Sequence, residues 1–308
     1  MRGELRTQSS ESWQETGAFW SYRALERAAR VVPEGAGRRI SRALGDAAFR
    51  VLGRMRAAVA GNQARVLGLD PADERVQAST REAFRLYARC WYDSFRLRAM
   101  TPEEIDTHID VRDFQHVEAA LAAGKGCLAA LPHMGNWDLA GRFLAVNGYR
   151  VASVAEELKP YRLFELFTRH RRELGIDILP LTSAHIRPEL ERLLADNWVV
   201  ALLADRDLTG RGVEVEMFGA PRRVPAGPAL LSLTTGTPLI VASVYTTARG
   251  WRIEVGPPLS PPRTGDLHTD VQELSQRMAT AFERAIVKQP ADWHLFEAGW
   301  PEVDAAGR

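Results

Sequence analysis

Short apolar segments alternate with segments of helical periodicity from about residue 124 onward, and this alternation limits the possible folds more than any other feature of the sequence. Nearly continuous apolar strands joined by helices are typical of a sheet that is covered on both faces. They predict an α/β domain with a central, mostly parallel sheet flanked by helices. The strands are expected in GCLAALP, RVASVAEE, IDILPL, WVVALLAD, PLIVASVYT and WRIEVG, and the helices over 139–146, 161–174, 188–195, 226–235 and 270–288.

The first hundred residues show helical periodicity instead. Apolar residues form one stripe within 25–32 and a longer one within 40–55, and Gly61-Asn62 is expected to end the second helix. A third helix is predicted to begin at Asp70, which would act as its N-cap, with a proline in the first turn. This part of the chain is therefore expected to be a helical subregion beside the sheet.

Charge is balanced over the whole chain but not along its length. A formal net charge of +1 gives no reason to expect a nucleic-acid partner. Up to Arg65, however, there are twelve arginines and six acidic side chains, and Trp13, Phe19 and Trp20 lie among them. Basic helices that carry aromatic residues bind anionic lipid, so an anionic membrane surface is an expected partner. The alternative is a solvated face of an arginine-rich chain, and charge alone does not choose between the two.

Several features place the protein in the cytoplasm. Cys90 and Cys127 lie in apolar surroundings, which favours buried thiols over a disulfide or a metal site. Apolar runs such as WVVALLA are much shorter than the ~20 residues that span a bilayer. The first residues, RGELRTQSSESWQE, lack the apolar core of a signal peptide. We expect a cytoplasmic protein that rests at most on a membrane surface.

The chain shows no repeat, no low-complexity tract and no obvious linker. The sequence therefore predicts a single domain over 1–308. In this domain, the helical subregion (1–100) faces the membrane and the α/β core (101–308) carries the chemistry.

Two polar clusters follow predicted strands. His133, Asn136 and Asp138 follow GCLAALP, and Asp205 and Arg206 follow VVALLA. In open α/β sheets, ligands bind beyond the carboxyl ends of the strands. The two clusters are therefore candidates for one common site.

The residue types in these clusters suit proton transfer from an alcohol. Histidine can act as a general base at neutral pH when a carboxylate orients its ring and stabilises the imidazolium. Either Asp138, in the first turn of the next helix, or Asp205, from a neighbouring strand, could be that carboxylate. The backbone N–H groups of the turn at Gly135-Asn136 could stabilise an oxyanion. Together these groups suit direct attack of an acceptor hydroxyl on an acyl thioester, with His133 as the base.

Other chemistries lack their motifs. The sequence contains no G-x-S-x-G elbow, no G-x-x-x-x-G-K-[ST] loop and no G-x-G-x-x-G after a strand. His133 and Asp138 could form half of a metal site, but His170, His185 and His294 show no supporting spacing, so we expect no metal and no cofactor. The alternative is that His133 is a buried core residue whose ring nitrogens are hydrogen-bonded within the protein and have no catalytic role. The proline before it and the second acidic strand end argue against that alternative.

The segment PHMGNWDLAG carries an H-x-x-x-x-D pattern that resembles the signature of the glycerolipid and lipid A acyltransferases. Its Gly-Asn-Trp and the later stretch ADRDLTGRGVEVEMFGAPRRVPAGPALL are similar to the lipid A late-acyltransferase branch. Within that branch, VAEELKPYRLFELFTRHRRELG, RDLTGRGVEVEMFG, PAGPA and PADWHLF resemble the phosphatidylinositol mannoside acyltransferases. The resemblance extends from about Glu11 to Trp300.

This resemblance implies a glycerolipid acyltransferase-like fold and a specific reaction. The family transfers a fatty acyl chain, which we expect to be palmitoyl, from acyl-CoA to a mannose hydroxyl of a phosphatidylinositol mannoside. It works as a peripheral protein at the cytoplasmic face of the plasma membrane. The resemblance implies catalytic roles for His133, Asp138 and Asp205. At the position of Asp205 the mannoside enzymes carry glutamate, so either the backbone lies closer here or Asp138 does more of the orienting.

The resemblance also suggests residues that bind substrate. Arg171 matches an arginine at the rim of the family's active site, and we predict that Asn136 and Arg206 bind substrate with it. Asn136 could instead hold the turn, and Arg206 could pair with Asp207 and only brace the strand end. Trp137 is expected to pack behind the motif.

Two further groups have open roles. Arg211, Arg222 and Arg223 could contact the phosphates of CoA or simply be solvated. Trp293 and His294 match positions that are structural in the family. The remaining functional alternatives are a different glycolipid or a lysophospholipid as the acceptor, and a non-catalytic lipid-binding protein with the same fold.

Overall fold

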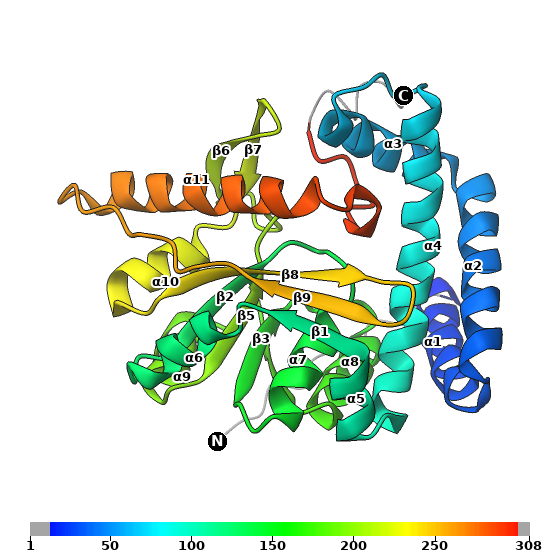
Figure 1. The fold of residues 1–308 in the computed structure, drawn as a ribbon, viewed down its shortest axis with the longest axis horizontal. Helices are drawn as coiled ribbons and strands as arrows, with labels where there is room; N and C mark the ends of the chain where they lie inside the picture. The colour runs from blue at the N-terminus through cyan, green and yellow to red at the C-terminus, as the bar shows by residue number, and fades with distance from the viewer. Residues whose placement is uncertain (1–12, 301–308) are drawn as a thin grey trace.

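A central seven-stranded sheet organises the computed structural model, which describes residues 13–300 (Figure 1). The strand order is β1-β9-β8-β2-β5-β3-β4, and each neighbouring pair is parallel except β8 and β9. The predicted fold class, a mostly parallel sheet flanked by helices, is confirmed. The strands are β1 (Ile109–Arg112), β2 (Cys127–Leu131), β3 (Val151–Ala155), β4 (Ile176–Pro180), β5 (Val199–Leu203), β8 (Leu239–Thr246) and β9 (Trp251–Val255).

Both faces of the sheet are buried, as the continuous apolar runs predict. Along β2, Leu128 and Ala130 belong to one hydrophobic cluster, whereas Cys127, Ala129 and Leu131 belong to another. In Figure 1, α11 lies on one side of the sheet and α5 and α7 lie on the other. The covering helices are α5 (Pro102–His108), α6 (Gln115–Ala122), α7 (Trp137–Val146), α8 (Tyr161–Glu173), α9 (Ile186–Ala195), α10 (Gly227–Thr235) and α11 (Leu267–Ile286).

Three strands were not predicted from the sequence. β1 is short and lies at the edge of the sheet, where it pairs with β9. β6 (Val213–Met217) and β7 (Ala220–Val224) form a separate antiparallel hairpin. Its turn has positive φ at Phe218 (51°) and Gly219 (70°), which matches the twist of a two-residue hairpin turn. No Asn-Gly or Asp-Gly signal marks that turn in the sequence.

Four helices precede the sheet: α1 (Trp13–Val31), α2 (Glu34–Val51), α3 (Gly53–Leu67) and α4 (Glu74–Arg96). The helical character of this subregion agrees with the sequence analysis, but the one helix expected over the 40–55 stripe is divided at Leu52 into α2 and α3. Two boundaries were also wrong. Gly61-Asn62 lies inside α3, which ends at Gly68 in the left-handed conformation (φ 65°). The N-cap of α4 is Asp73, whose side chain accepts from the backbone N–H of Arg75, and not Asp70. The single domain predicted over 1–308 stays a prediction.

Candidate active site

The site lies where β2 and β5 end side by side. The two strands are parallel neighbours, and Leu131 is in register with Leu203. The residues two positions further along, His133 and Asp205, therefore meet at the same edge of the sheet. His133 Nδ1 lies 2.6 Å from Asp205 Oδ1. The common site that was predicted from two strand ends thus brings a histidine and a carboxylate into direct contact.

Asp205 is fully buried and held from three directions. Besides its contact with His133, it accepts a hydrogen bond through Oδ2 from Trp293 Nε1 (2.7 Å). Its backbone carbonyl accepts from Arg222 Nε (3.1 Å) and Nη2 (2.7 Å). Burial by itself would raise the pKa of Asp205, but the charge and hydrogen bond of His133, the Trp293 bond and the charge of Arg222 hold it below its ordinary value. The carboxylate is therefore ionised at neutral pH.

The other ring nitrogen of His133, Nε2, is left for a ligand. The His133 side chain is 20% exposed and lines a cavity of about 480 Å³. The wall of this cavity is mainly apolar, with a few charged side chains, Glu156, Arg171, Arg187, Arg206 and Asp207. A smaller apolar cavity of about 80 Å³ adjoins it and shares Trp137, Val154, Arg171 and Leu203 as lining residues. His133 thus lies in the wall of a mainly apolar space.

Asp138 and Arg171 form a second charged pair in the site. Arg171 Nε donates to Asp138 Oδ1 at 2.8 Å, and the Asp138 side chain is 9% exposed. Of the two candidate carboxylates, it is Asp205 that contacts His133 in the described part of the chain. Asp138 instead fixes Arg171, which lines both cavities. Trp137 lies edge-on to the His133 ring, with the ring centroids 5.6 Å apart.

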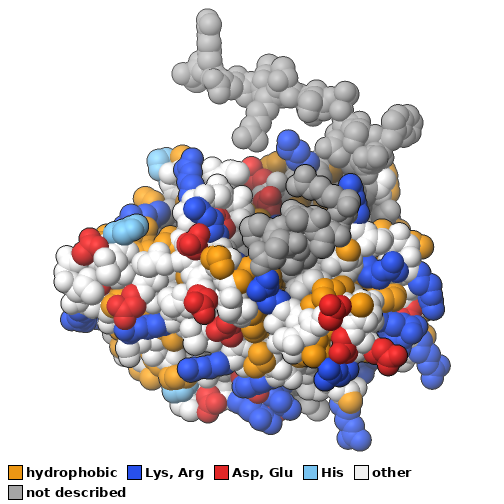
Figure 2. All heavy atoms as spheres, turned by 90° about the horizontal axis from the view of Figure 1, so that it is seen from above, with side chains coloured by type: hydrophobic (Ala, Val, Ile, Leu, Met, Phe, Trp, Pro, Cys, Tyr) orange, Lys and Arg blue, Asp and Glu red, His pale blue; other side chains and the backbone are white. Residues whose placement is uncertain are grey.

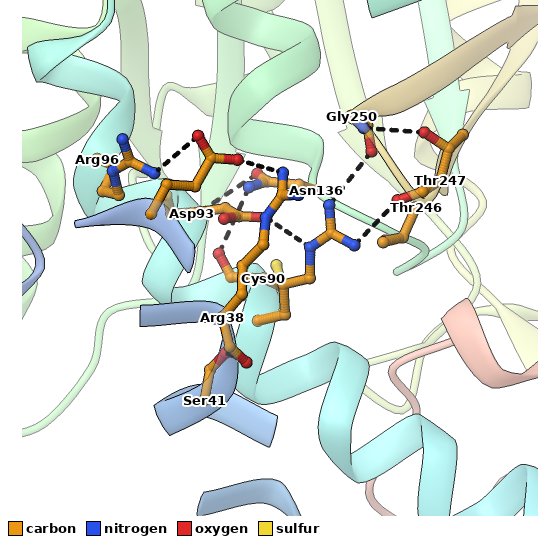
Figure 3. A network of polar contacts seen from close by, with 12 residues as sticks. Arg38, Ser41, Cys90, Asp93, Arg96, Asn136, Thr246, Thr247 and Gly250 are labelled. Carbon is orange, nitrogen blue, oxygen red and sulfur yellow. Dashed lines mark hydrogen bonds and ion pairs between the residues drawn. The ribbon is translucent and has the colours of Figure 1, made fainter. Parts of the chain in front are cut away.

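Asn136 is the N-cap of α7 and is buried. Its Oδ1 accepts from the backbone N–H of Leu139 (3.1 Å) and from Ser94 Oγ (3.2 Å), and its Nδ2 donates to the carbonyl of Cys90 (3.4 Å). Figure 3 shows this amide beside α4, in a polar network that continues through Asp93. The side chain is thus engaged within the protein and holds the turn. Substrate binding by Asn136 stays a prediction that these contacts do not favour.

The segment that contains Asp292, Trp293 and His294 clamps the loop of His133. The backbone N–H of His294 donates to the carbonyl of His133 (2.7 Å), and the N–H of Gly135 donates to the carbonyl of Asp292 (3.0 Å). The N–H of Gly135 is therefore not available as an oxyanion donor, and that part of the sequence-based interpretation was wrong. Gly135 has φ +60°, and a Cβ would lie 2.2 Å from the carbonyl oxygen of Val244, so only glycine fits.

The arginines near the site have different roles. Arg206 Nε lies 2.9 Å from Glu297 Oε1, and it does not pair with Asp207, which accepts from the backbone of its own loop. Arg222 was expected in a solvated or phosphate-binding loop. It is instead buried, with its guanidinium 4.9 Å from the ring of Trp300. Sequence analysis missed the role of Arg222 because the β6–β7 hairpin that carries it was not predicted.

Two other features bear on the possible chemistry. Over residues 13–300, no group of three or more His, Cys, Asp or Glu side chains is arranged to hold a metal ion. Within the same residues, no helix combines the length and the apolar character needed to cross a bilayer.

Comparison with known proteins identifies the family. The model of the family described as bacterial lipid A biosynthesis acyltransferase matches residues 6–301. The chain belongs to this family.

Curated relatives of this acyltransferase include two mycobacterial proteins. This chain is 41% identical, over 245 aligned residues, to the phosphatidylinositol mannoside acyltransferase of Mycolicibacterium smegmatis. The aligned region covers 78% of this chain and 77% of the relative. The chain is 38% identical, over 298 residues, to the protein of the same name from Mycobacterium tuberculosis (strain H37Rv), with 92% of this chain and 89% of the relative covered. As a lipid A biosynthesis acyltransferase family member, the chain is an enzyme that transfers acyl groups.

Proposed function

We propose that the protein transfers a fatty acyl chain, palmitoyl, from acyl-CoA to a mannose hydroxyl of a phosphatidylinositol mannoside, with His133 as the general base. The contact between His133 Nδ1 and the buried Asp205 carboxylate, in the wall of a mainly apolar cavity, is the observation that carries this proposal. The names of the relatives at 38–41% identity support the choice of acceptor.

The proposed reaction is a direct displacement at the thioester. Asp205 accepts the Nδ1–H of His133, so that Nε2 is the basic nitrogen and takes the proton of the acceptor hydroxyl. The hydroxyl oxygen attacks the thioester carbonyl carbon, a C–O bond forms, and the C–S bond of the collapsing tetrahedral intermediate breaks. The proton then passes from Nε2 to the CoA thiolate, which leaves as a thiol. No covalent enzyme intermediate and no cofactor are needed.

The same arrangement suggests where the substrates bind. The apolar cavities of about 480 and 80 Å³ suit an acyl tail, because most of their lining side chains are apolar and would be removed from water by a bound chain. Arg171, fixed by Asp138, and Arg206, at the wall of the larger cavity, are proposed to contact polar parts of the substrates. The acceptor is a membrane lipid, so we propose that the enzyme works as a peripheral protein at the cytoplasmic face of the plasma membrane, on an anionic surface.

The test is transfer of labelled palmitate from palmitoyl-CoA to purified phosphatidylinositol mono- and dimannosides. His133→Ala is expected to lose at least about a hundredfold in turnover, because a general base contributes roughly 10²–10⁴-fold. His268→Ala is the matched control, since His268 is an exposed histidine on α11 and does not line the cavity. Retention of most of the transfer by His133→Ala protein contradicts the role of the histidine. Label on another lipid, and not on the mannosides, contradicts the acceptor.

A further inference from the structure

Helix α2 packs against α4 with its smallest residues. Its buried positions are Gly37, Ser41 and Gly45. A Cβ at Gly45 would lie 2.6 Å from the Cα of Arg85 on α4, and one at Gly37 would overlap the ring of Tyr92. The small residues therefore let the two helix backbones approach closely, and the larger apolar side chains of α2 are left on other faces.

Those larger side chains are exposed. Figure 1 shows α2 as the outermost element on its side of the fold, with α4 between it and the sheet. No other described element covers the outer face of α2 in that view. We call the exposed apolar residues of α2 and of the adjoining start of α3 the α2 stripe. They are Ile40 (51% exposed), Leu44 (53%) and Val51 (75%) on α2, Leu52 (43%) between the helices and Met55 (37%) on α3.

A groove of about 450 Å³ opens at the α2 stripe, and four of the five stripe residues, all except Val51, also line it. Its walls come from α1, α2, the start of α3, α4 and Phe296, and they are almost entirely apolar. Along α4 the groove runs from Phe84 to Phe95, which is about 16 Å at ~1.5 Å per residue, a length that suits a long acyl chain. The residues of the groove include Ala28, Val32, Ile40, Leu44, Ala48, Leu52, Met55, Tyr87, Ala88 and Trp91.

The groove adjoins the active site. Trp91 lines the groove on one side and the cavity of His133 on the other. The indole thus forms a shared wall between the two spaces. A molecule whose tail occupied the groove would have its polar head close to the cavity that contains the base.

Charge around the groove favours an anionic lipid. Residues 34–67, which form α2 and α3, contain seven arginines and two acidic side chains. Figure 2 shows Lys and Arg side chains gathered along the right-hand edge of the molecule, the side on which α2 lies in Figure 1. Each basic side chain near an anionic membrane surface contributes about 1 kcal/mol to binding.

From these observations we infer that the groove between α2 and α4 binds an acyl chain of the acceptor lipid, while the α2 stripe rests in the bilayer from which that lipid comes. The inference rests on the proposed function for the identity of the lipid. The two substrates then place their acyl chains in separate spaces. The acyl chain of the donor occupies the cavity beside His133, and one acyl chain of the acceptor occupies the groove beyond Trp91. The acceptor then reaches the base without leaving the membrane completely.

The closing experiment uses two neighbouring alanines of α2. Ala48→Phe places a ring in the groove, whereas Ala47→Phe places the same ring at an exposed position that does not line it. Leu44→Ser, which makes the wall polar at an exposed position, is the second variant in case the larger side chain disturbs packing. Each protein is assayed with palmitoyl-CoA and either diacylated phosphatidylinositol dimannoside or its deacylated, water-soluble form.

Ala48→Phe and Leu44→Ser are expected to raise KM for the diacylated acceptor at least about tenfold relative to Ala47→Phe. Turnover of the deacylated acceptor should stay unchanged, because the groove is not part of its binding site. Equal KM values for Ala48→Phe and Ala47→Phe with the diacylated lipid overturn the inference. An equal loss with both acceptors also overturns it, since it places the groove on the donor's side.

A binding measurement separates this inference from the proposed function. Dioctanoyl phosphatidylinositol, kept below its micelle-forming concentration, is titrated into catalytically inactive His133→Ala protein by calorimetry. Binding should weaken at least about fivefold when Ala48→Phe is added and stay unchanged with Ala47→Phe. Equal affinities for the two double variants contradict a lipid site in the groove. The binding measurement tests the groove even if the wild-type protein acylates neither mannoside. Failure to acylate the mannosides would contradict only the proposed reaction.

Discussion

The side chain of Trp293 connects the C-terminal part of the described chain to the Asp205 carboxylate that contacts His133. Its indole N–H donates to Asp205 Oδ2, while Asp205 Oδ1 contacts His133. The indole thus fixes the plane of the carboxylate, and the carboxylate in turn fixes the imidazole ring. Trp293 does not line the cavity of His133, so it acts as a positioning residue.

Trp293→Phe is expected to lower kcat about tenfold and to leave KM for palmitoyl-CoA unchanged. The ring is kept, but a hydrogen bond to a charged group, which contributes about 1.5–3 kcal/mol, is lost. Because the same bond lowers the pKa of Asp205, the pH profile of kcat/KM should also shift. Trp300→Phe is the matched control, since the indole nitrogen of Trp300 is buried without a hydrogen-bond partner in the described structure. A variant at Trp293 with normal kcat and an unchanged pH profile would show that the bond only supports packing.

The contact between His133 and Asp205 was predictable from the sequence. The hydrogen bond from Trp293 that holds Asp205 was not. His133 and Asp205 each follow an apolar strand, so the rule for strand ends places them together. The contact between Trp293 and Asp205 joins residues 88 positions apart, and only the overall chain path determines it. The resemblance to the family singled out Trp293 but gave it no more than a structural role.

At the level of elements, periodicity predicted where helices occur better than it predicted which face of each helix packs. The apolar stripe within 40–55 correctly indicated helix, but it indicated one helix where the chain forms α2 and α3 with a break at Leu52. The face of α2 that packs on α4, however, is the one with Gly37, Ser41 and Gly45. Pattern analysis gives most weight to large apolar residues, and a contact formed by small residues therefore gives it little signal.

Gly45→Ala is expected to lower the free energy of unfolding by about 1–3 kcal/mol, the usual cost of overpacking a close contact. The added Cβ would lie 2.6 Å from the backbone of α4. Gly35→Ala in the same helix is the control, because nothing lies within 4 Å of its Cβ. That change should raise the free energy of unfolding by about 0.5–1 kcal/mol, since alanine favours helix. Urea unfolding monitored by circular dichroism measures both, and equal effects of the two changes would mean that α2 does not pack on α4 as described.

For the molecule as a whole, a few buried ionisable groups make the free energy of unfolding depend on pH. Burial raises the pKa of Asp292 from 3.8 to about 7, although a hydrogen bond from the backbone of Thr246 opposes this. Burial likewise raises the pKa of Asp93, beside Arg89, to about 6. Burial has the opposite consequence for His294, whose pKa falls to about 3. The contributions of these groups to the pH dependence of the free energy of unfolding oppose one another. The effect of one group is therefore measured best as the difference in that free energy between a variant and the wild type.

Asp292→Asn should become more stable relative to the wild type as pH rises from about 4 to 7, by roughly 1–4 kcal/mol in total. Between 3.8 and about 7, folded Asp292 keeps a proton that the unfolded chain has released, so its contribution to stability falls as pH rises. Asparagine does not ionise and escapes this loss, and above pH 7 the difference should level off. Urea denaturation at several pH values tests this. Exposed Asp177→Asn is the control, and a pH-independent gap for both variants would show that Asp292 does not carry a raised pKa.

The clamp that Asp292, Trp293 and His294 place on the loop of His133 has a consequence for biosynthesis. A ribosome makes these residues after the helices of the first hundred residues and after every strand of the sheet. Domains can begin to fold during synthesis, so α1 to α4 can form before these contacts exist. The nascent chain at that stage still lacks the indole and the two backbone contacts that hold the histidine. The loop of His133 can therefore acquire these contacts only after synthesis has passed residue 294.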